Sequence, residues 1–533
     1  MLISIVVAAV HAASPTPLPV TVPGSGIFQS SLLLSIVVWA PVLIAGVIAV
    51  LPNPRGRFDQ LMKQIAFFTN VGLLFLLWIA YNQFQPFLST VQFEEKIPWL
   101  PVIGATYHLG VDGPGLVMLL LSGLVGLVST LASFGIRERV RSYFCLLLLT
   151  EACVNGAVVA HDMFVLLLFW GAAAIPLALL VLGWGGPRRE AAAWRLVGYW
   201  GLGTIALLVA TMALFSATGG SSFDMDVVLK APLSPRVQLA IGAAVIVAAA
   251  TRLPLFPFHG WVRDVYSEAP VGVGIVVAGT ATRLGAYVIL RILVGAEPIG
   301  AQLLSPLLAA LAAATVIYAG LVVLRAADLR RVGAYLAMVP GGITVLGLAA
   351  LSPLAIGGSV LSLFSGGLAA ALIVGVCATL ADRAQTGSLS VLRGLAPRMP
   401  NLTWITVFAV LGLLGIPLMA SFTAEALTFF GAFKNQPLAA FAVAAGLAIV
   451  AASLAVILHR VLLGAPNPDA PGVSDASLGE KWFLGLLAGA LLWVGVFPGG
   501  PKLPGTDTPI FDPGLVNAMA AGITEIASPY AGK

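Results

Sequence analysis

The chain alternates long apolar runs with short segments that carry most of its charged residues. A helix that spans a membrane needs about 20 mostly apolar residues, and the runs reach that length. The pattern predicts an all-α integral membrane protein with about fourteen transmembrane helices. These helices are expected over residues 30–52, 63–84, 113–135, 142–160, 163–184, 194–217, 236–257, 271–296, 302–325, 330–351, 354–381, 403–430, 438–462 and 481–498.

The composition leads to the same class. Hydrophobic residues make up 59% of the 533 residues and charged residues 9%, whereas a soluble domain carries about 25% charged residues. We expect an N-terminal extension (1–29), a transmembrane domain (30–498) and a Pro- and Gly-rich tail (499–533) along the outer face. The first residues, MLISIVVAAVHAAS, resemble the apolar part of a signal peptide but lack a basic segment before it, so a cleaved signal and an uncleaved extension both stay open.

The basic residues between the predicted helices predict the orientation. Most of them lie in one set of alternate loops, and such loops stay in the cytoplasm. Both termini are therefore expected on the outer side, which requires an even number of helices. The outer loops and the two termini hold only six basic residues, Lys96, Lys230, Arg236, Lys434, Lys502 and Lys533. One of these outer loops, 85–112, contains short extended runs that favour a small hairpin.

Several kinds of chemistry have no support in the sequence. Cys145, Cys153 and Cys377 lie in apolar runs without the spacing of a zinc site, an iron–sulfur cluster or a disulfide framework. The chain lacks a phosphate-binding glycine motif and a nucleophile elbow. Its positive charges are spread over short loops, which does not indicate nucleic-acid binding. We expect no catalytic residue, metal site or cofactor in this chain.

Five charged residues remain inside the predicted spans once the loops and the span ends are set aside, and one of them, Arg291, lies two turns after Arg283, where its side chain can extend toward the interface. Arg252 and Arg283 lie deep in the seventh and eighth spans, Glu151 in the fourth and Glu425 in the twelfth. A charge at the centre of a membrane helix costs roughly 2.5–3.5 kcal/mol on insertion scales, so such residues face a paired or wet interior. These four residues, together with His259 at the end of the seventh span, are the predicted proton or ion path.

Two predicted spans contain signals for a break in the helix. Pro254 and Pro257 interrupt the seventh span, and Pro417 interrupts the twelfth just before Glu425. Proline removes a backbone donor, and unwound backbone at membrane depth is tolerated where it lines a cavity or is buried in protein. Breaks at matching places in two halves are typical of inverted repeats around an ion path. We expect such repeats in helices 4–8 and 9–13, although two unrelated kinks would give the same pattern.

The stretch RLPLFPFHGWVRDVYSEAP at 252–270 resembles the broken-helix signature of the antiporter-like membrane subunits of complex I (NADH-quinone oxidoreductase) and of Mrp antiporters. Order and spacing agree from about residue 30 to 465, and the short C-terminal end is most like the M-type subunit. Six further segments support the resemblance: VDGP (111–114), DMFVLLLFW (162–170), WGGP (184–187), AGTATRLGAYVILR (278–291), DLRRVGAY (328–335) and ASFTAEAL (420–427).

The resemblance implies a pair of proton half-channels joined by a central row of charges. In the family a Glu on the fifth helix pairs with a Lys on the broken seventh helix, and a Lys on the eighth helix and a Lys or Glu on the twelfth continue the row. Glu425 matches the last of these positions, and His259 matches a family histidine. Whether His259 acts in the path or caps carbonyls at the break stays open.

The chain departs from this pattern at five positions. The family glutamate is replaced by Gly171, the two lysines by Arg252 and Arg283, and two histidines by Pro340 and Gly366. A buried lysine can release its proton near neutral pH, whereas arginine keeps its proton in proteins. Glu151, one helix earlier, is a candidate substitute for the missing carboxylate.

Three functions are compatible with the sequence. The first is a membrane-arm subunit of a complex I-like oxidoreductase that couples electron transfer to proton translocation. The second is a scaffold with the same fold that does not pump, and the third is a transporter of another ion, such as bicarbonate or a cation. The expected location is the inner (cytoplasmic) membrane. The expected partners are other membrane subunits, the lipid bilayer, and protons or another small ion, without nucleic acid.

Overall fold

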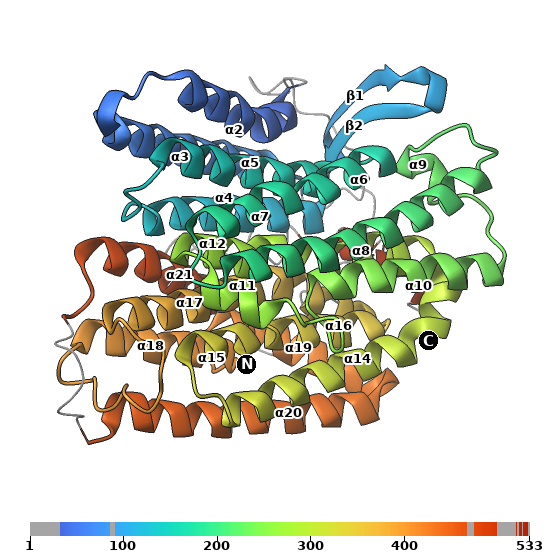
Figure 1. Cartoon of the computed structure of the whole chain (residues 1–533). Helices are drawn as coiled ribbons and strands as arrows, with labels where there is room; N and C mark the ends of the chain where they lie inside the picture. The colour runs from blue at the N-terminus through green and yellow to red at the C-terminus, as the bar shows by residue number, and fades with distance from the viewer. Residues whose placement is uncertain are drawn as a thin grey trace, which may run out of the picture.

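The computed structural model describes residues 32–85, 91–465, 474–497, 519, 522–524 and 526–530. Long helices lie side by side and run in nearly the same direction through the whole molecule (Figure 1). The predicted extension 1–29 and most of the predicted tail 499–533 lie outside the described residues. In the described part of the tail, the Tyr530 hydroxyl donates a hydrogen bond to the carbonyl of Val294 at 2.8 Å.

The N-terminal half begins with two helices and a strand pair and continues through the first predicted five-helix set. Its helices are α2 (Leu33–Val50), α3 (Asp59–Gln83), α4 (Gly113–Ala132), α5 (Val140–Val159), α6 (Met163–Ala172), α7 (Ala174–Trp184), α8 (Arg189–Ala217), α9 (Met225–Val228), α10 (Pro235–Arg252), α11 (Val262–Glu268), α12 (Val271–Val276) and α13 (Arg283–Val288). Short 3-10 turns lie at η1 (Pro54–Gly56) and η2 (Pro101–Ile103), and π-helical turns at η3 (Val277–Ala281) and η4 (Ile289–Val294).

The C-terminal half holds the second predicted set and one further helix. Its helices are α14 (Pro298–Leu324), α15 (Leu329–Leu336), α16 (Val339–Ala349), α17 (Pro353–Arg383), α18 (Pro400–Leu413), α19 (Ala420–Asn435), α20 (Pro437–Leu458) and α21 (Leu478–Val496), with a π-helical turn η5 (His459–Leu463) and a 3-10 turn η6 (Ser528–Tyr530).

Twelve helices within the described residues are long and apolar enough to span a membrane. The two further predicted spans, the seventh and the twelfth, are each split into two pieces, α10 with α11 and α18 with α19, and the longest piece has 18 residues. Both broken helices are the fourth in a set of five. Each set has five spans, so the chain leaves a set on the side of the membrane opposite to the one where it entered. The second set therefore starts from the opposite side, and the two sets are inverted relative to each other. The predicted all-α membrane fold is confirmed.

The prolines account for both breaks. Pro254 and Pro257 lie between α10 and α11, and Pro417 lies between α18 and α19. At the first break, the amide of Phe256 donates to the Thr315 hydroxyl of α14 at 3.0 Å. The indole of Trp261 donates to the carbonyl of Thr251 at 2.8 Å. Side chains thus satisfy backbone groups that a continuous helix would have paired within itself.

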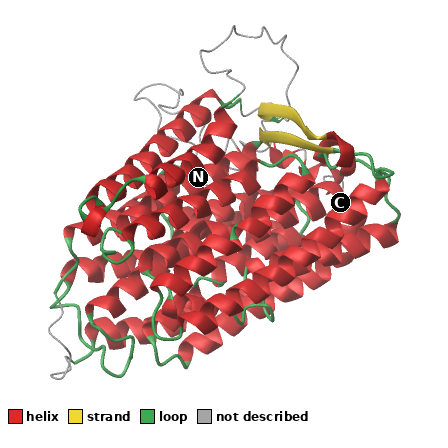
Figure 2. Cartoon of the chain, turned by 45° about the horizontal axis from the view of Figure 1, so that its top comes forward, coloured by secondary structure: helices red, strands yellow, loops and turns green. Residues whose placement is uncertain are grey.

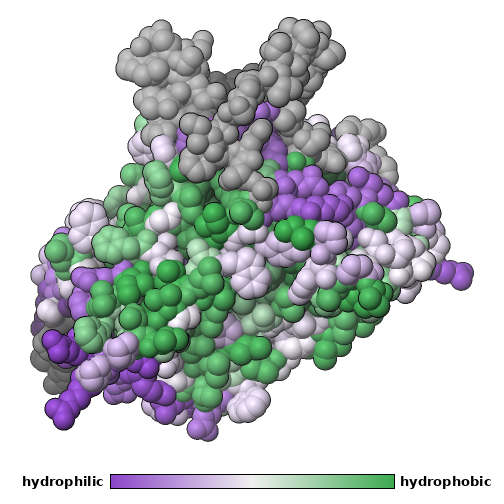
Figure 3. Space-filling model, turned by 90° about the horizontal axis from the view of Figure 1, so that it is seen from above, coloured by the Kyte–Doolittle hydropathy of each residue, from purple (hydrophilic) through white to green (hydrophobic). Residues whose placement is uncertain are grey.

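The buried centre of the bundle consists of three spans, Val271–Val294, Leu329–Ala349 and α17. Helix α17 packs against α4, α12, α16, α18, α19 and α21. The outer helices instead present large apolar side chains, and on α2 and α3 these include Leu43, Phe68 and Phe75. Figure 3 shows a broad apolar area on one side of the molecule, as expected of a surface that contacts lipid.

The predicted hairpin is present at one end of the bundle. Strands β1 (Gln92–Leu100) and β2 (Ala105–Val111) pair antiparallel beside the helices (Figure 2). Successive strand residues point to opposite faces. The buried Glu95 therefore points toward α2, where its Oε1 accepts a hydrogen bond from the amide of Leu34 at 2.8 Å. The same carboxylate accepts from the amide of Ser35 at 3.2 Å, so it holds the hairpin against the start of the first described helix.

Candidate functional site: a row of buried charges

The four charged side chains of the predicted path all lie within the predicted spans. Glu151 is in α5, Arg252 is the last residue of α10, Arg283 is the first of α13, and Glu425 is in α19. Arg252 and Arg283 are fully buried, Glu151 is 3% exposed, and Glu425 is partly exposed. None of the four forms an ion pair with any residue that the structure describes.

Arg252 lies between two indole rings. Its guanidinium carbon is 4.0 Å from the ring centroid of Trp170 and 4.2 Å from that of Trp200. Its Nη2 donates to the carbonyl of Trp170 at 2.7 Å. The next residue is Gly171, where the resemblance implies a glutamate, and a Cβ there would meet the methyl group of Thr204 at 3.2 Å. Two aromatic faces and a carbonyl therefore stabilise the cation where the family pattern has a carboxylate.

Glu151 contacts a different part of the bundle. A Cβ on Gly126 of α4 would lie 2.4 Å from Glu151 Oε1 and 2.9 Å from Asn70 Oδ1, so the glycine makes room for both side chains. Asn70 of α3 donates to the hydroxyl of Thr130 at 3.0 Å, while Glu151 Oε1 has no hydrogen-bond partner among the described residues. The suggestion that Glu151 replaces the missing partner of Arg252 is not supported, because no ion pair joins them.

Arg283 follows the π-helical turn η3 (Val277–Ala281), in which the amide of Thr282 bonds back to the carbonyl of Val277 at 3.1 Å. Such turns are frequent at functional sites, because the extra residue changes the direction of the side chains. Arg283 Nη2 donates to the carbonyl of Ala337 at 3.3 Å. Its Nε and Nη1 have no partner within the described chain.

A small cavity lies beside Glu425. Its volume is about 10 Å³, which is about the space that one water molecule needs. A Cβ on Gly366 would lie 3.8 Å from Arg283 Nη1, which places the guanidinium beside the cavity wall. Three serines, Ser362, Ser365 and Ser421, belong to the cavity wall. Their hydroxyls can donate and accept hydrogen bonds, so a water molecule in the cavity would find partners. The wall consists of Pro340, Ile343, Ser362, Ser365, Gly366, Leu413, Ser421, Ala424 and Glu425.

Pro340 and Gly366, where the resemblance implies histidines, both belong to this wall. A Cβ on Gly366 would come within 2.8 Å of the Pro340 Cβ, so any side chain at 366 would require the proline to move. The carboxylate of Glu425 lies against Gly415, whose φ is +57° in the break before α19. A small cavity with three serines and a glutamate in its wall therefore lies where the resemblance implies imidazole rings.

His259 lies at the break between α10 and α11, where the sequence places it. Its half-buried ring is 4.5 Å from the ring of Tyr318 and 5.6 Å from that of Phe256, between centroids. Its Nδ1 has no hydrogen-bond partner within the described residues. The stacked rings hold His259 in place without using its nitrogen atoms.

Sequence reasoning missed Asn70, Trp200 and Ser421. Asn70 is a polar residue within an apolar span, and that signal alone could have identified it. Trp200 gave no signal, because only the packing of α8 against α10 brings its ring to Arg252. The serine is likewise ordinary in sequence and becomes notable only because it lines a cavity with Glu425.

The chain matches a known protein family over a long segment. Residues 160–450 match the model described as "NADH:quinone oxidoreductase/Mrp antiporter, TM". The chain is 30% identical over 442 residues to NAD(P)H-quinone oxidoreductase chain 4 of Synechococcus sp. (strain JA-2-3B'a(2-13)), which covers 82% of this chain and 83% of the relative. It is 28% identical to NADH-quinone oxidoreductase subunit M of Rhodobacter capsulatus over 87% of this chain and 93% of that one.

The fold has a match among solved structures. A chain of respiratory complex I from Thermus thermophilus with bound NADH superposes with a TM-score of 0.81 at 24% identity, covering 92% of this chain and 99% of that chain. The solved neighbour is a subunit of a multi-subunit membrane complex, and the chain described here is a multi-pass integral membrane protein. The family match begins directly after α5 and ends within α20, and the protein belongs to the NADH:quinone oxidoreductase/Mrp antiporter family of membrane subunits.

Proposed function

We propose that this chain is a membrane-arm subunit of a complex I-like oxidoreductase and that it couples electron transfer to proton translocation. The observations that carry the proposal are the row of charged side chains on α5, α10, α13 and α19, three of which are buried, and the small cavity beside Glu425. Residues of this kind inside a membrane are costly unless they serve a path for ions or protons.

The two kinds of charge have different roles in this proposal. Glu151 and Glu425 can take up and release protons. Arg252 and Arg283 keep theirs and act as fixed positive charges that bias the carboxylates. Protons therefore pass Arg283 by way of water and the serine hydroxyls of the cavity, not by way of the guanidinium. This differs from the lysine and histidine relay that the family resemblance implies.

The proposed location is the inner (cytoplasmic) membrane, with both termini and the hairpin on the outer side. The basic loops, which belong in the cytoplasm, support this orientation. The proposed partners are other membrane subunits of the complex and the lipids around the bundle. The transported species is the proton or another small ion. Cofactors and quinone belong to other subunits in this proposal.

The test measures protons moved per electron pair in liposomes that contain the whole complex, with wild-type chain or Glu425→Gln. Removing the titratable group should lower the ratio while a native gel shows intact assembly. Glu190→Gln is the matched control, because Glu190 is an exposed carboxylate at the start of α8, outside the row. An unchanged ratio for assembled Glu425→Gln would refute proton translocation through this chain.

That negative result would favour a scaffold that retains the family fold but does not pump, or a carrier of another ion. One observation keeps the scaffold in consideration. Neither Arg252 nor Arg283 has a carboxylate partner within the described residues, so the charge pair that modulates the cation in the family pattern is missing. Normal assembly with an unchanged proton ratio would identify the scaffold or the other carrier.

A further inference from the structure

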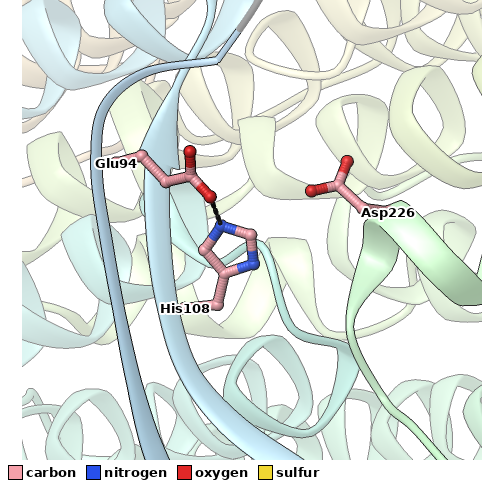
Figure 4. Close-up of side chains that lie close together, drawn as sticks. All are labelled: Glu94, His108 and Asp226. Carbon is pink, nitrogen blue, oxygen red and sulfur yellow. Dashed lines mark ion pairs between the residues drawn. The ribbon is translucent and has the colours of Figure 1, made fainter.

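A second group of polar side chains lies at the hairpin end of the bundle, away from the charge row. Glu94 of β1, His108 of β2 and Asp226 of α9 each turn one ligand atom toward a common space (Figure 4). The three atoms all lie within 4.8 Å of one another. Glu94 and Asp226 approach the imidazole ring from two sides, and His108 Nε2 is 2.9 Å from Glu94 Oε1.

His108 is fixed in an orientation that leaves Nε2 facing this space. The side chain is fully buried, and Nε2 has no geometrically acceptable hydrogen-bond partner among the described residues. On the other side of the ring, Nδ1 lies 3.2 Å from the carboxylate of Asp224. Lys96 in turn contacts Asp224 at 2.5 Å. A carboxylate behind the imidazole is the usual support of a metal-binding histidine, because it fixes the tautomer and the ring orientation.

We propose that Glu94, His108 and Asp226 form a binding site for a divalent transition-metal ion of the Zn²⁺ type. Two ligand atoms of one tetrahedral zinc ion lie about 3.3 Å apart, given bond lengths of about 2.0–2.2 Å. The present arrangement needs only small rotations of the two carboxylates to reach that spacing. Both side chains are 49% exposed, and the one ion pair that Asp226 forms among the described residues is a 3.8 Å contact with the exposed Lys230. The carboxylates can therefore rotate while the buried histidine stays in place.

The chemistry of the ligands selects the class of metal. An imidazole nitrogen suits zinc and its neighbours, whereas Mg²⁺ and Ca²⁺ prefer sites made of oxygen atoms alone. Three carboxylates, Glu94, Asp224 and Asp226, outnumber two ammonium groups, because Lys96 contacts Asp224 and Lys230 lies 3.8 Å from Asp226. The local charge therefore still attracts a cation. The direct contact of Lys96 is with Asp224, the supporting carboxylate.

The fold explains how the three ligands meet. Lys96 pairs with His108 across the two strands, and Glu94 lies two residues earlier, on the same face of β1. The register shifts between Gln92 and Glu95, which bends the strand beside Glu94. Asp226 comes from α9, whose amide at Met225 bonds to the carbonyl of His161 at 2.9 Å. A bound ion would thus tie the hairpin to the connection between α8 and α10.

The test measures zinc binding by the full-length chain in detergent. The protein is first stripped of metal with EDTA and is then titrated with Zn²⁺ in competition with a chromophoric zinc indicator. We expect one zinc ion per chain, with binding weakened at least 100-fold in His108→Gln and at least 10-fold in Asp226→Asn. Asp224→Asn should weaken it about 10-fold to 100-fold, as loss of a supporting carboxylate does elsewhere. X-ray absorption of the zinc form should show one imidazole nitrogen among oxygen ligands.

His459→Gln is the matched control, because this exposed histidine lies in η5 and should leave binding unchanged. Asp226→Asn and Glu94→Gln keep the test decisive if His108→Gln disturbs the hairpin, since both change half-exposed side chains. The proposal is overturned if the wild-type chain binds no zinc. It is also overturned if wild-type affinity survives in Asp226→Asn and Glu94→Gln, or if Mg²⁺ displaces Zn²⁺ at equal concentration.

Discussion

The aromatic environment of Arg252 allows a quantitative test of how this chain stabilises a buried cation without a carboxylate. The perturbation is a double-mutant cycle that combines Arg252→Met with Trp200→Leu. The cycle isolates the interaction between the guanidinium and the Trp200 ring from the effects of each substitution alone. This matters here because removing a buried charge changes the desolvation energy as well as the contact.

The expected size of the coupling follows from the geometry. The guanidinium carbon lies 4.2 Å from the Trp200 ring centroid, and Arg252 has no exposed surface. A desolvated cation–π contact is worth about 2 kcal/mol, compared with about 0.5–1 kcal/mol at an exposed site. The cycle should therefore give a coupling of about 2 kcal/mol. The hydrogen bond from Arg252 to the Trp170 carbonyl is lost in the Arg252→Met single mutant and in the double mutant alike. Its contribution therefore cancels from the coupling energy.

The assay is equilibrium unfolding in mixed micelles of SDS and a mild detergent, followed by far-ultraviolet circular dichroism, because loss of a tryptophan would change the fluorescence itself. The matched control is a cycle of Arg252→Met with Trp261→Leu. Trp261 packs edge-on against Trp200 at 5.6 Å, and no cation–π contact with Arg252 is recorded for it within the described structure. Its coupling should stay near 0.5 kcal/mol. Equal couplings in the two cycles would refute the cation–π explanation and leave only general packing.

Two further predictions concern stability and use the same unfolding assay. Glu95→Gln should destabilise the protein by about 1.5–3 kcal/mol, because the buried carboxylate accepts backbone hydrogen bonds at the start of α2; Glu94→Gln in metal-free buffer should have little effect, and equal losses would contradict this explanation. Gly126→Ala should cost about 1–3 kcal/mol, because its Cβ would lie 2.4 Å from Glu151 Oε1. Gly46→Ala is the matched control, because no atom lies within 4 Å of the new Cβ, and it should not destabilise the protein. A similar loss of stability in Gly46→Ala would show that the crowding at Gly126 is unimportant.

Much of the architecture was predictable because it depends on local properties of the sequence. Apolar runs give the spans, since only a helix satisfies its own backbone in lipid. Proline gives the breaks, since Pro254, Pro257 and Pro417 cannot donate the hydrogen bonds of a continuous helix. Arg252 and Glu425 were identifiable for a related reason, because a charge inside an apolar run is too costly to be incidental.

The sequence by itself thus determined the membrane-spanning helices, the two breaks and the identity of the buried charges. The partners of those charges were decided by tertiary structure alone. The rings around Arg252, the cavity beside Glu425 and the cluster around His108 each join side chains from separate elements. The reason is physical: helix formation and the cost of burying a charge depend on neighbours along the chain. Contact between two side chains depends on how helices rotate and pack against each other, and no spacing within one helix specifies that.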